Sequence, residues 1–364
     1  NLYGTARWQA LSKAIAQSSR PIVVFTSDIA SALKIEQELR FFDPSIVIHH
    51  FPDWETLPYD RFSPYQDIIS ERLTTLSLIP EFRKEILIVS VQTAMHRVVP
   101  SEWVASHSFS LVKGEVLDRE KFRKKLVDNG YRSSPQVSES GEYAIRGSLI
   151  DVFPVGSDNP IRIDFFDNEI ETLRMFDVET QRSTQEVKEI RVLPGKEFLL
   201  DQSGVSRFRR QWRTEFGQFH DVDLYRDVSE GLPPPGIEYY LPLFHDRMEL
   251  LADYFSEDTI CVFDENIEKT ADQFWTSVEE RHEALKDDTN RPVLEPSQVF
   301  CKFEGLLTTT EKFGLIFLTG LNTGLAESSI FGTRTPLSRS IDARAKDPFA
   351  LVKNHVDHSD GRTL

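Results

Sequence analysis

The stretch Gly141–Ser183 decides how the middle of this chain folds, and it reads GEYAIRGSLIDVFPVGSDNPIRIDFFDNEIETLRMFDVETQRS. Three runs rich in β-branched and aromatic residues are separated by turn residues, so we expect strands over Tyr143–Phe153, Ile161–Phe166 and Glu169–Phe176. A Gly-Ser-Asp-Asn-Pro segment separates the first two runs. Asp167-Asn168 is a two-residue connection of the hairpin type, although it lacks the usual glycine. The pattern predicts a three-stranded unit.

Side chains alternate between the two faces of a strand, so the faces of the second run can be assigned. Ile161 and the apolar residues at the next two alternate positions share one face, which is a core face. Arg162, Asp164 and Phe166 share the other. A phenylalanine beside arginines on an outer face has the composition of a protein-binding hot spot. Two interpretations remain at this point: Phe166 is covered by another domain of the same chain, or it is exposed for a partner.

Composition places the chain among soluble globular proteins. Its 364 residues, 40% hydrophobic and 27% charged, suggest two or three domains with a core each. No apolar run approaches the ~20 residues that span a bilayer, and no signal peptide is visible, so we expect a cytoplasmic protein without membrane contact. Two cysteines, Cys261 and Cys301, cannot build a disulfide framework. The net charge of −16 disfavours non-specific attraction to nucleic acid.

The regions on either side of the opening stretch have the pattern of an α/β fold. Short apolar runs typical of buried parallel strands occur at Pro21–Phe25, Ile46–Phe51, Glu85–Val91, Thr259–Phe263 and Leu315–Leu318. Segments with helical apolar spacing lie between the runs, and an alternation of strands and helices favours a parallel sheet. We therefore expect one parallel sheet that is interrupted by an inserted small α+β domain.

The predicted organisation has four parts. Residues 1–107 and 193–320 form the two halves of the parallel-sheet domain, and residues 108–192 form the inserted domain. Residues 321–364 are a linker-like tail that leads into a further domain. A first residue other than Met and an end in DHSDGRTL suggest a piece of a longer protein.

Parallel sheets of this kind often bind nucleotide through a G-x-x-x-x-G-K-[ST] loop, whose backbone N–H groups and lysine hold phosphates. The sequence lacks that loop, since the Gly195-Lys196 pair is followed by Glu197. The expected fold is that of a P-loop NTPase domain without its phosphate loop. Asp264 and Glu265 follow a buried strand, where an acidic pair would hold Mg²⁺ in a motor ATPase. Without a phosphate loop we interpret this pair as a vestige.

Three separated motifs resemble one bacterial family. Phe51–Asp60, FPDWETLPYD, is followed by Ser63-Pro64 and by Asp67–Leu73, DIISERL. This block is similar to the amino-terminal module of the transcription-repair coupling factor (Mfd) family. The Gly141–Ser183 stretch resembles the second domain that this family shares with the excision-repair protein UvrB. Gly236–Phe244, GIEYYLPLF, resembles a third block common to both.

One departure separates the two relatives. UvrB carries a long aromatic hairpin that threads damaged DNA, whereas here only Arg61–Asp67 lies between the Tyr-Asp motif and the next helix. So short a segment cannot form two useful strands plus a turn. Strand threading of the UvrB type should therefore be missing, and the Mfd family is the better match.

The resemblance implies a surface on the inserted domain that binds the UvrA protein. The family's contact positions are two arginines and a phenylalanine, and the motifs RGSLIDVFP and RIDFFD place them at Arg146, Arg162 and Phe166. Arg146 fits less well, because strict alternation groups it with Ile150 unless a bulge at Gly147 releases it. Outer-face truncations rarely unfold a domain, so we expect an Arg162→Ala, Phe166→Ala double variant to lose UvrA binding and keep its melting temperature.

We therefore expect an adaptor that recruits UvrA to lesion-stalled RNA polymerase in nucleotide excision repair. The family's ATP-dependent DNA translocase motor, with its ATP and Mg²⁺, would lie outside this segment, as would its contacts with RNA polymerase and double-stranded DNA. The segment itself should hold no cofactor and catalyse no reaction. The alternative is a UvrB-like DNA-stimulated ATPase or helicase that uses Asp264 and Glu265.

Two further features have a functional and a plainer interpretation. The predicted helix Val205–Phe216 carries four arginines that could contact nucleic acid, although a solvated helix face is favoured. Two histidines and two aspartates within His355–Asp360 are metal-ligand types. Their place in the predicted tail favours coincidence, so we expect no metal site.

Overall fold

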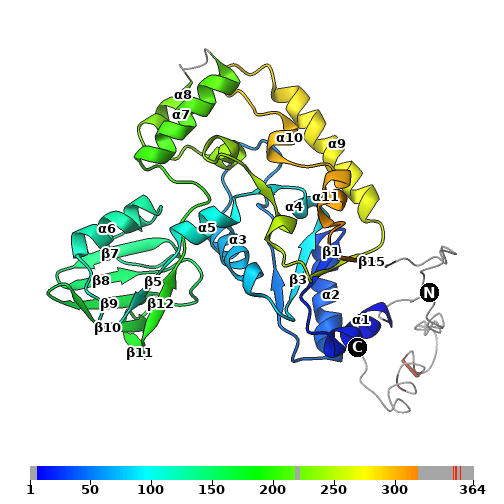
Figure 1. The fold of residues 1–364 in the computed structure, drawn as a ribbon, viewed down its shortest axis with the longest axis horizontal. Coiled ribbons are helices and arrows are strands. Elements are labelled where there is room, and N and C mark those ends of the chain that lie inside the picture. The colour runs from blue at the N-terminus through cyan, green and yellow to red at the C-terminus, as the bar shows by residue number, and fades with distance from the viewer. Residues whose placement is uncertain (1–5, 218–221, 319–346, 348, 351–352, 354–364) are drawn as a thin grey trace.

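The structure is a computed structural model that describes residues 6–217, 222–318, 347, 349–350 and 353. Its α-helices in the described ranges are α1 (Ala6–Gln17), α2 (Ile29–Phe42), α3 (Gln66–Leu78), α4 (Val91–Ala94), α5 (Ser101–His107), α6 (Arg119–Asp128), α7 (Gln202–Phe216), α8 (Asp223–Ser229), α9 (Ile267–Leu285), α10 (Pro296–Val299) and α11 (Phe303–Thr310). The 3-10 helices are η1 (Ile79–Glu81), η2 (Ile237–Leu243) and η3 (Leu251–Tyr254). Figure 1 shows a sheet with α6 at one end of the molecule and a second sheet with α1 and α2 at the other.

A five-stranded parallel sheet is built from both sides of the opening stretch. Its strands are β1 (Ile22–Thr26), β2 (Ile48–His50), β3 (Ile86–Ser90), β14 (Ile260–Phe263) and β15 (Gly314–Phe317). Their order is β15-β14-β1-β3-β2, and every neighbouring pair is parallel. The predicted parallel sheet is therefore confirmed. Three of its strands precede residues 109–192 and two follow them.

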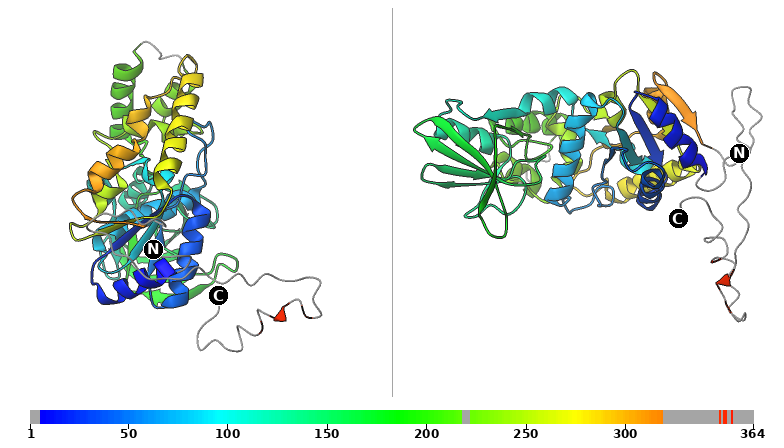
Figure 2. Two further views of the ribbon diagram at one scale, coloured as in Figure 1. Left: turned by 90° about the vertical axis from the view of Figure 1, so that its right-hand side faces the viewer. Right: turned by 90° about the horizontal axis from the view of Figure 1, so that it is seen from below.

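Helices cover both faces of this sheet (Figure 2). On one face Trp8 of α1 and Leu39 of α2 belong to the same apolar cluster as Val24 of β1. On the other face Phe25 belongs to a larger cluster that includes Leu73 of α3. Burial on two faces explains why the strands are continuous apolar runs rather than alternating ones.

A six-stranded sheet occupies the middle of the chain. Its strands are β6 (Arg132–Ser133), β7 (Glu142–Arg146), β8 (Leu149–Val152), β9 (Ile161–Phe166), β10 (Glu169–Phe176) and β11 (Ser183–Val187). The order is β11-β10-β9-β8-β7-β6, and all pairs are antiparallel except β6 with β7. The predicted second and third strands are confirmed. The predicted single strand Tyr143–Phe153 is wrong, because a turn at Gly147-Ser148 divides it into β7 and β8.

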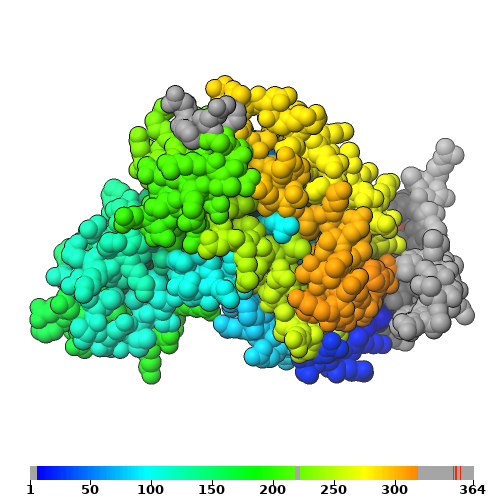
Figure 3. Space-filling view, turned by 45° about the horizontal axis from the view of Figure 1, so that its top comes forward, coloured from blue at the N-terminus to red at the C-terminus, as the bar shows by residue number. Residues whose placement is uncertain are grey.

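Two small ribbons complete the strands of the described residues. They pair β5 (Phe109–Val112) with β12 (Glu189–Val192), and β4 (Arg97–Val98) with β13 (Glu249–Leu250). Because β5 and β12 are antiparallel, the chain enters and leaves the six-stranded region along adjacent paths. In the space-filling view the atoms of this region are in continuous contact with the rest of the described chain (Figure 3).

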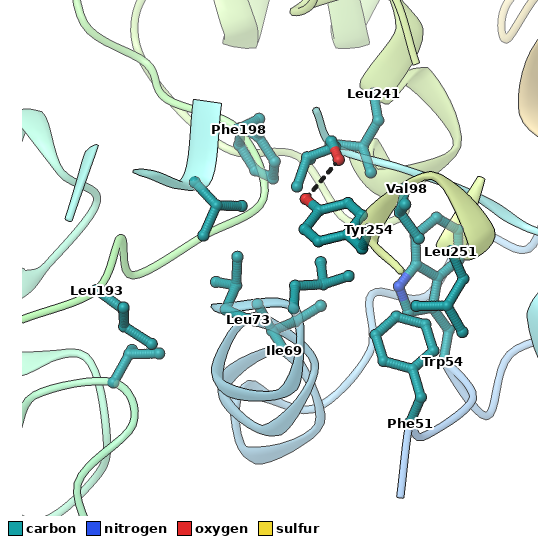
Figure 4. Close-up of a cluster of buried hydrophobic side chains, with 14 of the residues drawn as sticks. Phe51, Trp54, Ile69, Leu73, Val98, Leu193, Phe198, Leu241, Leu251 and Tyr254 are labelled. Atoms are coloured by element: carbon teal, nitrogen blue, oxygen red, sulfur yellow. Dashed lines mark hydrogen bonds between the residues drawn. The ribbon is translucent and has the colours of Figure 1, made fainter. Parts of the chain in front are cut away.

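The segment that follows β12 packs against the first half of the chain. Figure 4 shows Leu193 and Phe198 beside Ile69 and Leu73 of α3, within one buried apolar cluster. His245 lies at the same junction, where its Nε2 is 2.9 Å from the carbonyl oxygen of Glu197. The two sheets therefore share a core at this junction.

A buried ion pair lies at the same junction. Arg72 Nε is 3.2 Å from Glu197 Oε1, and the two side chains are 0% and 1% exposed. Trp54 Nε1 donates to the second carboxylate oxygen at 3.2 Å. Arg72 Nη1 donates to the carbonyl of Pro52 at 2.9 Å, and the guanidinium lies 4.4 Å from the ring centre of Phe51. The carboxylate and the aromatic rings thus compensate part of the cost of burying the Arg72 cation, whose Nη2 makes no hydrogen bond to any described residue.

Three further expectations can be compared with the fold. Residues 51–65, all of them described, contain no strand, so the short connection forms no long hairpin, as expected. Almost all of the predicted tail, 321–364, lies outside the described residues. Among the described helices, none combines the length and the apolar character that crossing a membrane requires.

The buried histidine at the junction predicts a pH-dependent stability. Burial lowers the pKa of His245 to about 4, against about 6.5 when the chain is unfolded. Below about pH 6.5 the His245 imidazole binds a proton in the unfolded chain, whereas in the folded chain it stays neutral down to about pH 4. The contribution of the neutral imidazole to the free energy of unfolding is therefore full above pH 6.5 and is lost as pH falls toward 4. His245→Gln replaces the ring N–H that faces the Glu197 carbonyl by an amide N–H and removes the titration. In urea unfolding, the advantage of the parent over this variant should shrink by about 2 kcal/mol between about pH 6.5 and pH 5. A pH-independent difference would contradict a neutral buried imidazole.

Candidate protein-docking site

All three predicted contact residues lie on one face of the six-stranded sheet, which we call the outer face. Arg146 is paired with Leu149 across β7 and β8, and Leu149 is paired with Asp164 across β8 and β9. Residues directly opposite in antiparallel strands point to the same face. Arg162 and Phe166 stand two residues on either side of Asp164, so alternation places them on this face as well.

The turn between β7 and β8 brings Arg146 to the outer face. Gly147 has φ of 65°, which glycine adopts without strain, and the turn reverses the chain within two residues. The expected bulge at Gly147 is therefore replaced by a hairpin turn. Arg146 faces away from Ile150, which is 1% exposed on the inner face. Its guanidinium donates one hydrogen bond to the carbonyl of Pro135 at 2.8 Å and remains exposed.

Phe166 is exposed at the end of β9. The burial of β9 alternates strictly, and Phe165 is 4% exposed whereas Phe166 is 69% exposed. The predicted hairpin turn is confirmed, since Phe166 pairs with Glu169 and Asp167 supplies a positive φ of 54°. Within the described residues Phe166 therefore fits the interpretation that it is exposed for a partner, and not the one in which another domain of the chain covers it. Strand spacings of ~4.8 Å and rises of ~3.4 Å put the Cα atoms of Phe166 and Arg146 roughly 12 Å apart.

Arg162 occupies a different environment from the other two. Its Nε and Nη2 donate to the two oxygens of Asp151 at 2.8 and 2.9 Å, and Nη1 donates to the carbonyl of Gln181 at 3.2 Å. The guanidinium also lies 4.7 Å from the ring centre of Phe176. The side chains of Arg162 and Asp151 are 18% and 2% exposed. The hydrogen bonds to Asp151 raise the pKa of Arg162, so it stays fully charged.

The outer face thus has a covered end and an open end. At the covered end Val137, Ala144 and Phe176 form a small buried cluster beside the Asp151–Arg162 pair. At the open end Arg146 and Phe166 are exposed. The expectation that Arg162→Ala leaves the melting temperature unchanged does not fit this geometry, because it would leave the buried Asp151 carboxylate without its cation.

The acidic pair Asp264 and Glu265 lies at the end of β14, beside β1. Arg7 of α1 places Nη1 2.9 Å from Asp264 Oδ1 and 3.1 Å from Glu265 Oε1. Burial raises the pKa of Asp264, and the neighbouring Arg7 opposes that rise. A guanidinium from the first helix therefore pairs with both carboxylates of the acidic pair.

The connection from β1 to α2 is equally unlike a phosphate loop. β1 ends at Thr26 and α2 begins at Ile29, so only Ser27 and Asp28 lie between them. Asp28 caps the helix, and its carboxylate accepts a hydrogen bond of 2.7 Å from the backbone N–H of Ser31. The anion-binding end of the helix is thus occupied by the chain's own carboxylate.

The other predicted candidates find less support. In α7, Arg207 and Arg210 lie 3.2 and 3.9 Å from the carboxylate of Asp246, and Arg209 donates to Ser229 Oγ at 3.0 Å. The His355–Asp360 set lies outside the described residues. Within the described part of the chain, no group of three or more ligand-type side chains is arranged to hold a metal ion.

Sequence reasoning missed Asp151 and Arg7, the two partners that define these sites. Asp151 is a charged residue inside an otherwise apolar strand, and such a residue signals a buried partner. Arg7 gave no comparable signal, since it is 257 residues away from Asp264.

Comparisons with known proteins give one match to a region of the chain and several matches to nearly its whole length. The family model described as the UvrB interaction domain matches residues 109–198, which span β5 to the segment after β12. The transcription-repair-coupling factor of Escherichia coli K12 is 37% identical over 364 residues, which is 99% of this chain and 32% of that protein. The Haemophilus influenzae protein of the same name is 36% identical over 98% of this chain and 31% of its own length. The chain spans about a third of the length of these curated relatives.

The ion pair on the outer face predicts a coupled effect on stability. Arg162→Ala should lower the free energy of unfolding by about 3 kcal/mol, because it leaves a carboxylate buried and unpaired. The Asp151→Ala, Arg162→Ala double variant should be less destabilised than the sum of its single variants, by about 1.5 kcal/mol or more. Exposed Arg146→Ala is the matched control and should change stability by about 0.5 kcal/mol or less. Strict additivity in urea unfolding would show that the pair is not coupled.

Proposed function

The chain belongs to the transcription-repair-coupling factor family, and on that premise we propose that it acts as an adaptor that docks UvrA through the open end of its outer face. The observation that carries the proposal is the exposed pair Arg146 and Phe166, held on one sheet face within the region that matches the UvrB interaction domain. The name of that family model supports an interaction with the UvrA–UvrB machinery.

The chemistry of the open end suits a protein partner. Phe166 offers a large apolar surface with few rotatable bonds, so its burial costs little side-chain entropy. The Arg146 guanidinium has donors left over from its single recorded hydrogen bond, and its planar fork fits a partner carboxylate. Arg162 contributes differently: with three hydrogen bonds made inside the sheet, it holds β8 and β9 in place rather than reaching for the partner.

For the whole protein we propose the role that the relatives' name describes, coupling of transcription to repair. In this account the chain recruits UvrA to RNA polymerase stalled at a lesion, as a step of nucleotide excision repair in the cytoplasm. We propose that contacts with RNA polymerase and double-stranded DNA, and the ATP and Mg²⁺ of a translocase motor, lie outside this chain, which covers about a third of the length of its relatives.

The competing function is that of a UvrB-like ATPase or helicase. It is less well supported, because Asp28 caps the helix that would hold phosphate and Arg7 pairs with both acidic residues. We propose that this part of the chain is not an enzyme. We also propose that its parallel sheet is a P-loop-NTPase-like fold without the phosphate loop, and that it serves as a scaffold for the six-stranded region.

The proposal predicts a specific loss of UvrA binding. Phe166→Ala should weaken the affinity by roughly 30- to 1000-fold, since truncating a central hot spot typically costs about 2–4 kcal/mol. Arg146→Ala should weaken it further, and both variants should melt near the parent's temperature because the side chains are exposed. Calorimetric titration of purified UvrA provides the measurement.

Matched controls lie outside residues 109–198, one before that region and one after it. Phe62 is 72% exposed on the connection before α3, and Arg213 is exposed on α7. Phe62→Ala and Arg213→Ala should bind UvrA as the parent does. If they weaken binding as much as the outer-face variants, or if the outer-face variants bind normally, the docking site is assigned wrongly.

Nucleotide binding separates the two functions. The adaptor account predicts no saturable binding of ATP–Mg²⁺ up to millimolar concentration, because the Asp28 carboxylate caps the helix end that would bind phosphate and the Arg7 guanidinium pairs with both Asp264 and Glu265. Fluorescent-nucleotide titration, with a functional P-loop ATPase as the positive control, checks this. Micromolar affinity would favour the ATPase account.

A further inference from the structure

A second exposed apolar residue lies on the outer face beside Phe166. Val116 is 75% exposed, in the segment between β5 and α6. It forms an antiparallel bridge with Glu169 at the start of β10. Hydrogen bonds on both sides fix this register, since Ile170 N–H donates to the carbonyl of Glu115 at 2.9 Å and Leu117 N–H donates to the carbonyl of Asn168. The position of Val116 is therefore held by backbone pairing.

The pairing places three side chains in one row across the sheet. Glu169 is opposite Phe166 on one side and opposite Val116 on the other. Directly opposed residues share a face, so all three point to the outer face. Two strand spacings of ~4.8 Å put the Cα atoms of Phe166 and Val116 roughly 10 Å apart.

The middle residue of the row carries an exposed negative charge. Neither a hydrogen bond nor an ion pair is recorded for the Glu169 carboxylate among the described residues, and the residue is exposed. The neighbouring carboxylate, Asp164, makes a contact of 3.5 Å with Ser148 Oγ. The row thus presents an apolar group, a carboxylate and a second apolar group, next to the cation of Arg146.

We propose that Val116 and Glu169 extend the UvrA docking surface beyond Arg146 and Phe166. This inference rests on the proposed function. The complementary surface of UvrA then carries two apolar contacts with a lysine or arginine between them, and a carboxylate for Arg146. Val116 gives the interface a second apolar contact at little entropic cost, because its β-branched side chain is already stiff. Glu169 selects for a cation at the centre and against a partner with an acidic group there.

Two substitutions test the two parts of the proposal. Val116→Thr keeps the β-branched shape and replaces a methyl group by a hydroxyl, and it should weaken UvrA binding by about 3- to 10-fold. Glu169→Lys puts like charges together and should weaken binding by 10-fold or more at low salt, with a smaller effect at about 0.5 M salt because of screening. Affinities are measured by titration calorimetry against purified UvrA.

Control variants of the same type lie away from the row. Val127, 47% exposed on α6, takes the Val→Thr change, and Glu179, exposed between β10 and β11, takes the Glu→Lys change. Both controls should bind UvrA within about 2-fold of the parent, and the test variants should keep the parent's melting temperature. If Val116→Thr and Glu169→Lys bind like their controls while Phe166→Ala weakens binding, the extension is wrong and the proposed function stands. If Phe166→Ala also binds normally, or the parent does not bind UvrA, the proposed function itself fails.

Discussion

The arrangement of the two sheets depends on one buried ion pair, Arg72 with Glu197. Arg72 belongs to α3, which packs on the five-stranded sheet, and Glu197 belongs to the segment that returns from the six-stranded sheet. Transferring two charges out of water costs several kcal/mol per ion, so the position of each charge depends strongly on its partners, although the buried Nη2 of Arg72 makes no hydrogen bond within the described part of the chain. Here Trp54 serves the second carboxylate oxygen, and the ring of Phe51 faces the guanidinium. A displaced returning segment would separate Glu197 from Arg72 and leave the buried guanidinium without a carboxylate.

Close backbone contact at the same junction strengthens this constraint. A Cβ atom on Gly195 would lie 2.8 Å from the carbonyl oxygen of Gly130, so glycine is required for the returning segment to pass the end of α6. Gly195 N–H also donates to the carbonyl of Asn129 at 2.7 Å. Charge pairing, apolar packing and backbone hydrogen bonds therefore hold the six-stranded region against the rest of the chain. These contacts set the orientation of its outer face. A surface held in this way suits docking, because little of its conformational entropy is left to be lost when a partner binds.

Much of the fold could be predicted from the sequence, for reasons that are local. Strands such as β1 and β3 are continuous apolar runs, so their predicted bounds, Pro21–Phe25 and Glu85–Val91, differ from the observed ones by one residue at each end. The β7–β8 hairpin was missed because alternation assumes an unbroken strand. Arg146 and Leu149 are three residues apart, which puts them on opposite faces of one strand but on the same face of a hairpin.

The site was predicted less completely, because partners across strands and across the chain carry no local signal. Alternation gives the face of Arg162, but its bond to Asp151 depends on the register of β8 against β9. The resemblance to a known family supplied the three contact positions and could not distinguish an arginine that is exposed from one that is held inside the sheet. The row that includes Val116 could not be predicted from the sequence, because it depends on the bridge between Val116 and Glu169, which pairs a loop segment with a strand.

Hydrogen–deuterium exchange of the chain with and without UvrA tests the central claim most directly, because it reports the docking surface without any substitution. The account predicts that UvrA slows exchange in the two turns of the open end, around Gly147-Ser148 and Asp167-Asn168, and in the segment around Val116. Exchange at the end of β1 and the start of α2 should be unchanged. Protection confined to the parallel sheet, with both turns exchanging as freely as in the isolated chain, would contradict the account.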